Sequence, residues 1–89
     1  MDVMLKAEFE QYIDGEISLL TEKVNDDKHS ANDEVSAGKL TFYLALRGFM
    51  TGQVSNEARG IIGAVNDTLQ KLQLIDGRAT LPTIVANLR

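Results

Sequence analysis

Along most of the chain, hydrophobic side chains recur at steps of three and four positions, which is the spacing of one face of an α-helix. Polar stretches at residues 25–33 and 51–55, and the turn residues Asp76 and Gly77, interrupt this pattern. The pattern therefore predicts four helices, over about residues 3–24, 35–50, 56–74 and 81–88.

Residues typical of helix ends stand at these boundaries. Ser55 and Thr80 precede the third and fourth helices, where their side chains can cap free backbone N–H groups, and Pro82 suits a first helical turn. Gly52 follows the second helix, where glycine readily takes the left-handed conformation that ends a helix. Residues 71–81 leave an alternative open, because Asp76-Gly77 is also a strong hairpin signal. We favour a helix, since a lone hairpin has no third strand to pair with.

An 89-residue chain is one domain, with a core close to the lower limit of stability. It has no cysteine, so neither disulfides nor thiolate metal sites add to that stability. We therefore expect an all-α, three- to four-helix antiparallel bundle that buries further surface as a homodimer. The predicted core consists of the residues near the centre of the apolar face of each of the first three predicted helices: Phe9, Ile13, Ile17, Leu20, Leu40, Tyr43, Leu44, Ile62, Val65, Leu69 and Leu72.

The second predicted helix is apolar over more of its circumference than one core face requires. Surplus apolar surface on a small helix usually means that something else covers it. We therefore predict a partner or dimer interface there, with Arg47 as a polar anchor beside Phe42, Leu46, Phe49 and Met50.

Small residues on the third helix indicate a close approach by another helix. Gly60 and Ala64 lie one turn apart, as do Gly63 and Asp67. Packing within the chain explains this spacing most simply, and a dimer seam is the alternative.

Charge divides unevenly between the two parts of the chain. Residues 1–34 carry ten acidic and three basic side chains, giving −7, whereas residues 35–89 carry six basic and three acidic, giving +3. The simpler interpretation is attraction within the molecule together with a solvated acidic face. The alternative is an acidic surface for a basic partner, which also keeps nucleic acid away.

No residue pattern predicts catalysis or a cofactor. The single histidine, His29, lies in a charged loop and has no second nitrogen ligand near it for a metal. The run from Gly60 to Gly63 lies inside a helical row, without the strand and the lysine of a phosphate loop. We therefore expect a protein that is not an enzyme and needs no cofactor or metal. Since no apolar run approaches the roughly 20 residues that span a bilayer, and no signal peptide is evident, we expect a cytoplasmic location without membrane contact.

Nucleic-acid binding is a weaker alternative. The second and third helices could form a helix-turn-helix, with residues 56–74 as the recognition helix. Binding to phosphates needs an excess of cations. That segment has only Arg59 and Lys71, against Glu57 and Asp67, so its charge disfavours DNA.

From about residue 33 onwards the chain resembles the enterobacterial AriR/YmgB-type regulators of biofilm formation and acid resistance. The resemblance consists of a helix over residues 40–50 with a small-residue break at 51–53, an isoleucine-rich helix from Val54, and a short amphipathic helix over 81–89. It implies an all-helical homodimer that acts as a connector or modulator in transcriptional or two-component signalling. Both protein partners and DNA are linked to that family, and the acidic charge of this chain favours a protein.

The predicted function is therefore regulation through binding to a protein, without catalysis. One alternative is a bacteriocin-immunity-like or inhibitor protein that binds a foreign protein, since small acidic helical proteins also include that class. The other alternative is the helix-turn-helix DNA-binding regulator.

Overall fold

Four helices make up the computed structural model, which describes residues 4–25 and 31–89. They are α1 (Lys6–Val24), α2 (Ala31–Thr51), α3 (Asn56–Lys71) and α4 (Leu81–Ala86), and no strand occurs among the described residues. The predicted all-α helical bundle is confirmed. The alternative hairpin over residues 71–81 does not form.

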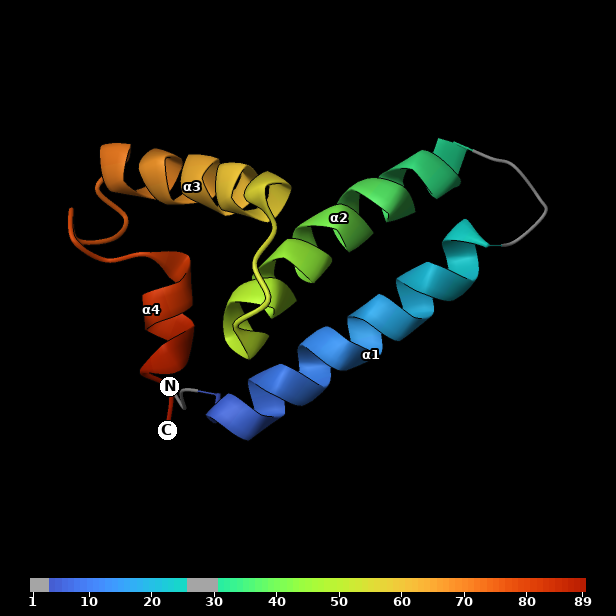
Figure 1. Ribbon diagram of the computed structural model, residues 1–89, viewed down its shortest axis with the longest axis horizontal. Coiled ribbons are helices and arrows are strands. Elements are labelled where there is room, and N and C mark those ends of the chain that lie inside the picture. The colour runs from blue at the N-terminus through green and yellow to red at the C-terminus, as the bar shows by residue number, and fades with distance from the viewer. Residues whose placement is uncertain (1–3, 26–30) are drawn as a thin grey trace.

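α2 is the central helix of the fold, and it packs against each of the other three. α1 runs antiparallel beside it, α3 lies on its other side, and the short α4 packs against α2 and α3 (Figure 1). Lys6 at the start of α1 donates its backbone N–H to the carbonyl oxygen of Arg89 at 2.6 Å, so both ends of the described chain meet.

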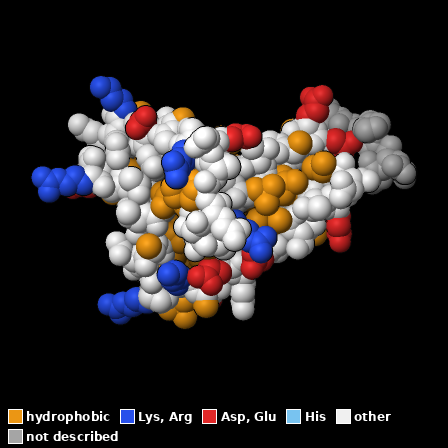
Figure 2. Space-filling view, viewed as in Figure 1, with side chains coloured by type: hydrophobic (Ala, Val, Ile, Leu, Met, Phe, Trp, Pro, Cys, Tyr) orange, Lys and Arg blue, Asp and Glu red, His pale blue; other side chains and the backbone are white. Residues whose placement is uncertain are grey.

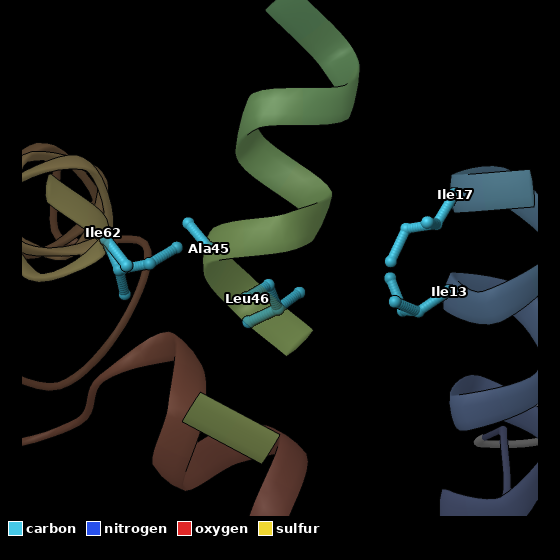
Figure 3. Close-up of a cluster of buried hydrophobic side chains, with 6 residues drawn as sticks. Ile13, Ile17, Ala45, Leu46 and Ile62 are labelled. Atoms are coloured by element: carbon cyan, nitrogen blue, oxygen red, sulfur yellow. The ribbon is translucent and has the colours of Figure 1, made fainter. Parts of the chain in front are cut away.

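The hydrophobic core lies on both sides of α2. Ile13 and Ile17 of α1 point toward α2 from one side, and Ile62 of α3 points toward it from the other (Figure 3). Ile13 and Ile62 are the most completely buried side chains, at 1% and 0% exposure. Full burial of such a side chain contributes about 1.5–3 kcal/mol. The central cluster is Ile13, Ile17, Ala45, Leu46, Ala58 and Ile62.

The predicted core is correct for α1 and wrong at two leucines. Among the predicted residues, Ile13, Ile17, Leu20 and Ile62 are buried. Leu44 and Leu72, in contrast, are 48% and 63% exposed. The physical reason is that α2 lies between two helices and turns Ala45 and Leu46, rather than Leu44, toward the core. Five other predicted core residues are partly buried: Phe9, Leu40, Tyr43, Val65 and Leu69.

The junction between α2 and α3 has the geometry expected of a glycine helix stop. Gly52 has a φ of +78°, in the left-handed region, and the N–H of Gln53 donates to the carbonyl oxygen of Gly48 at 2.9 Å. Ser55 then caps α3 by accepting the N–H of Ala58 at 3.0 Å. The predicted stop and cap are both confirmed.

α3 ends three residues before the predicted position. Gln73 has a φ of +60°, and the N–H of Leu74 donates to the carbonyl oxygen of Leu69 at 2.9 Å, which closes the helix at Lys71. Thr80 caps α4 by accepting the N–H of Thr83 at 3.2 Å, as predicted. α2 begins at Ala31, before the predicted start at residue 35. None of the helices in the described ranges is both long and apolar enough to cross a membrane.

One polar contact joins the aromatic side chains of α1 and α2. The hydroxyl oxygens of Tyr12 and Tyr43 lie 3.1 Å apart, and the two rings meet edge to face. The hydrogen bond to Tyr12 raises the pKa of Tyr43 to about 12, with burial and the negative charge of Glu16 acting in the same direction.

Candidate protein-binding surface

The five residues predicted to form an interface lie mainly against the core of the chain itself. Leu46 is only 2% exposed and belongs to the central cluster, so its predicted place on an exposed surface is wrong. Phe42, Phe49 and Met50 are partly buried against that cluster. Arg47 remains at the surface, where its Nε lies 3.3 Å from Oδ1 of Asp14 on α1.

The wide apolar circumference of α2 is explained by its central position. A helix between two neighbours needs two apolar faces, and α1 and α3 cover the two faces of α2. Contact of the five predicted residues with a partner stays a prediction. A continuous apolar surface that is only partly covered lies elsewhere, on α3 and on Leu72, which follows it.

One side of α3 is fixed by the chain that follows it. The side-chain oxygen of Asn66 accepts the backbone N–H of Leu81 at 2.7 Å. The amide nitrogen of Gln70 donates to the carbonyl oxygen of Ala79 at 2.6 Å. Polar side chains therefore hold the α3–α4 connection and the start of α4 against this side of α3.

The opposite side of α3 carries apolar side chains that nothing in the described chain covers completely. We name this surface the α3 strip and define it by six residues: Ile61, Ala64, Val65, Thr68, Leu69 and Leu72. Leu72 is 63% exposed, and Ala64 and Thr68 are also exposed. A shallow open depression of about 250 Å³ lies among Ala64, Val65, Thr68 and Leu69 and is lined almost wholly by apolar atoms. From Ile61 to Leu72 the strip is about 16 Å long at 1.5 Å per residue.

A groove continues the α3 strip onto α2. This α2–α3 groove has a volume of about 250 Å³ and lies between the second half of α2 and the first turns of α3. Thr41, Leu44 and Ala45 line it on one side, and Ala58 and Ile61 on the other. Because Ile61 belongs to both features, groove and strip form one surface across two helices.

Opposite charges stand at the two ends of the α3 strip. Glu57 lines the groove in the first turn of α3, and Lys71 lies in the last turn. Both side chains are exposed, and neither has an ion-pair partner within the described residues. On a larger scale, Figure 2 shows most Lys and Arg side chains at the end of the molecule that holds α3 and α4, with acidic side chains spread mainly over the middle and the other end.

α1 carries a second, less continuous set of exposed apolar side chains. Leu5, Tyr12 and Leu19 are 52%, 43% and 55% exposed and follow one another at intervals of seven residues. Single apolar side chains at this separation, about 10 Å along a helix, are normal on protein surfaces. The α3 strip differs because its apolar residues are contiguous and join a groove.

No group of three or more acidic or histidine side chains among the described residues is arranged to hold a metal ion, and His29 lies outside these residues. In comparisons with protein-family models, with curated proteins and with solved structures, the chain has no match. The resemblance of residues 33–89 to AriR/YmgB-type regulators therefore stays a prediction.

The sequence analysis did not recognise the α3 strip, because it assigned Val65, Leu69 and Leu72 to the core. One signal for it was present in the sequence. The predicted fourth helix is short, and a helix of six residues, as α4 is, covers only part of a 16-residue neighbour. The fourth helix by itself therefore does not cover the whole apolar face of the third.

Proposed function

We propose that this chain acts without catalysis, by binding another protein through the α3 strip and the α2–α3 groove. The observation that carries the proposal is a continuous apolar surface across α2 and α3, in which Leu44 and Leu72 are exposed and Ile61 and Val65 are half-buried. Contiguous apolar surface with a polar rim is typical of protein interaction sites. A groove beside an apolar helix face suits an amphipathic helix of a partner.

DNA binding has less support from the same surface. The charged residues of α3 are Glu57, Arg59, Asp67 and Lys71, so the helix has no net positive charge. Attraction to phosphates requires an excess of cations near the contact. An apolar strip between an acidic and a basic end suits a protein helix better than a nucleic acid.

The role that such binding serves depends on the partner. A connector or modulator in transcriptional or two-component signalling would use the α3 strip to change the activity of a signalling protein. An immunity or inhibitor protein would use it to block a foreign protein. Both roles need a strip that is open to a different protein, so the identity of the bound partner, a second copy or a different chain, decides whether either role applies.

Site-specific photocrosslinking in the native cells tests the proposal. A photoreactive phenylalanine analogue is placed at Thr68 or Leu72 in the strip, and at exposed Ser18 on α1 as the matched control. We expect a covalent adduct with a protein from both strip positions and none from Ser18. The mass of the adduct shows whether the partner is a second 9.8 kDa chain or a different protein. An adduct that is absent from the strip, or equally strong at Ser18, would overturn the proposal.

A further inference from the structure

Four residues of the α3 strip, of which Ile61 and Val65 are half-buried and Thr68 and Leu72 are exposed, have the spacing of a coiled-coil seam. Ile61, Val65, Thr68 and Leu72 follow one another at steps of four, three and four residues, which is the alternation of a and d positions in a heptad. With Val65 at an a position, Glu57, Ala64 and Lys71 all occupy g positions beside the seam. In coiled coils, charges at g and e positions determine the partner and its orientation.

We propose that the α3 strip binds the α3 strip of a second copy of this chain, in an antiparallel, two-fold symmetric pair that crosses at Ala64. This inference rests on the proposed function and names its partner. In this register Ile61 of each copy packs against Val65 of the other. Ala64 lies at the crossing point in both copies, where a side chain of one carbon lets the helices approach closely.

Charge complementarity selects this orientation. Glu57 and Lys71 lie seven residues on either side of Ala64, so an antiparallel crossing at Ala64 brings Glu57 of each copy beside Lys71 of the other. Within one chain these residues are 14 positions apart on the same helix, or about 21 Å, too far for an ion pair. A parallel pair would instead place like charges together at both ends. The antiparallel pair gains two ion pairs. Its two-fold symmetry uses the same surface on both copies, so association stops at the dimer.

The α2–α3 groove receives a side chain in the same arrangement. The groove lies beside the first turn of α3, and Leu72 follows the last turn. Antiparallel pairing therefore carries Leu72 of each copy, 63% exposed in the single chain, over the groove of the other. Leu44, 48% exposed at the edge of the groove, becomes covered by the same contact.

The expected dimer is weak, because the strip and the groove together offer roughly half of the 20–30 residues per side found in standard interfaces. We expect a dissociation constant on the order of micromolar for a weak pair of this kind. The two ion pairs at its edges are then a large enough part of the affinity to be measured.

Charge reversal, measured by sedimentation equilibrium, tests the register. The variants are Glu57→Lys, Lys71→Glu, the double variant and an equimolar mixture of the two single variants. Arg59→Glu, elsewhere around α3, is a matched control that changes the net charge as much as Lys71→Glu does. Circular dichroism confirms that each variant is folded.

We expect each single variant to weaken self-association about tenfold, since two surface ion pairs become two repulsions. The double variant and the mixture should both return to within about threefold of the wild type, because each restores two Lys–Glu contacts. Arg59→Glu should leave the affinity unchanged.

Two results would overturn the inference. A dimer that is insensitive to both single reversals would exclude this register. A wild-type chain that stays monomeric at every concentration would exclude self-association. In that second case a photocrosslink from Leu72 to a different protein would still support the proposed function, whereas no crosslink at all would end both proposals.

Discussion

Gly48 allows the chain between α2 and α3 to pass close to the backbone of α2, and its replacement by alanine tests this close contact. A Cβ atom at this position would lie 2.8 Å from the backbone oxygen of Gln53, a separation that real Cβ atoms essentially never show. The close oxygen belongs to the backbone of the α2–α3 junction, so no flexible side chain can move aside. The same Gln53 donates its N–H to the carbonyl oxygen of Gly48 at 2.9 Å. A shift of Gln53 therefore also disturbs the hydrogen bond that closes α2.

The size of the effect follows from two opposing contributions. Alanine is favoured over glycine inside a helix by about 1 kcal/mol. Inserting a methyl group into a closed contact typically costs about 1–3 kcal/mol in backbone shifts, and weakening the hydrogen bond of Gln53 costs about 1 kcal/mol more. The clash and the weakened hydrogen bond together outweigh the gain in propensity, and we expect Gly48→Ala to lower the free energy of unfolding by about 1–3 kcal/mol.

Gly38→Ala is the matched control, on the same helix. A Cβ atom there would meet nothing within 4 Å, so only the propensity term acts. We expect Gly38→Ala to raise the free energy of unfolding by about 0.5–1 kcal/mol. Urea denaturation followed by circular dichroism at one fixed protein concentration measures both variants. Equal stabilisation of the two variants would refute the contact at Gly48, since the junction would then relax at no cost.

Three further predictions follow from the buried, strained and titrating groups. Leu46→Ala should lower the free energy of unfolding, measured by urea denaturation, by about 2–5 kcal/mol, because it opens a cavity in the core. Leu44→Ala should change the free energy of unfolding of the monomer by less than about 0.5 kcal/mol. Similar losses in the two variants would contradict the observed orientation of α2. Gln73→Gly should stabilise the protein by about 0.5–1 kcal/mol, because a side chain in the left-handed region is strained, and a loss of stability in the same assay would show that the turn is not strained. The pKa of Tyr43 is raised from 10.0 to about 12, so the stabilisation linked to its protonated form is complete below pH 10 and is lost as the pH rises toward 12. Absorbance of phenolate at 295 nm should therefore show that the pKa of Tyr43 falls toward its ordinary value in Tyr12→Phe, with burial and Glu16 still raising it, and an unchanged titration would rule out the shared hydrogen bond as the main cause.

The helix boundaries that depend on local chemistry were predictable. Ser55 and Thr80 cap the helices that they precede, and Gly52 takes the left-handed conformation that only glycine adopts without strain. The end of α3 was not predictable in the same way. A glutamine, Gln73, takes the left-handed position there, and no glycine or proline stands at this helix end before Gly77.

The choice between core and surface on α2 depends on tertiary structure. Leu44 and Leu46 are equally hydrophobic and two positions apart, so they face different sides of the helix. The spacing of hydrophobic residues along α2 shows two apolar faces. It does not show which neighbouring helix covers which face. The positions of the other helices around α2 decide that Leu46 is buried and Leu44 is half exposed. The α3 strip was missed for the same reason, because an apolar row indicates that a face will be covered and does not show by what.

The arrangement of the helices explains why the apolar face of α3 is only partly covered. α2 has neighbours on both sides, whereas α3 packs against α2 on one side and is otherwise contacted by the α3–α4 connection and the short α4. The molecule is correspondingly elongated, with a radius of gyration of 14.3 Å against about 12 Å for a compact domain of this length. Six large hydrophobic side chains are buried among the described residues, and ten are exposed. Pairing α3 with α3 of a second copy would place a helix on both sides of α3, as α1 and α3 already do for α2, and would cover Leu44 and Leu72 without any change within the monomer.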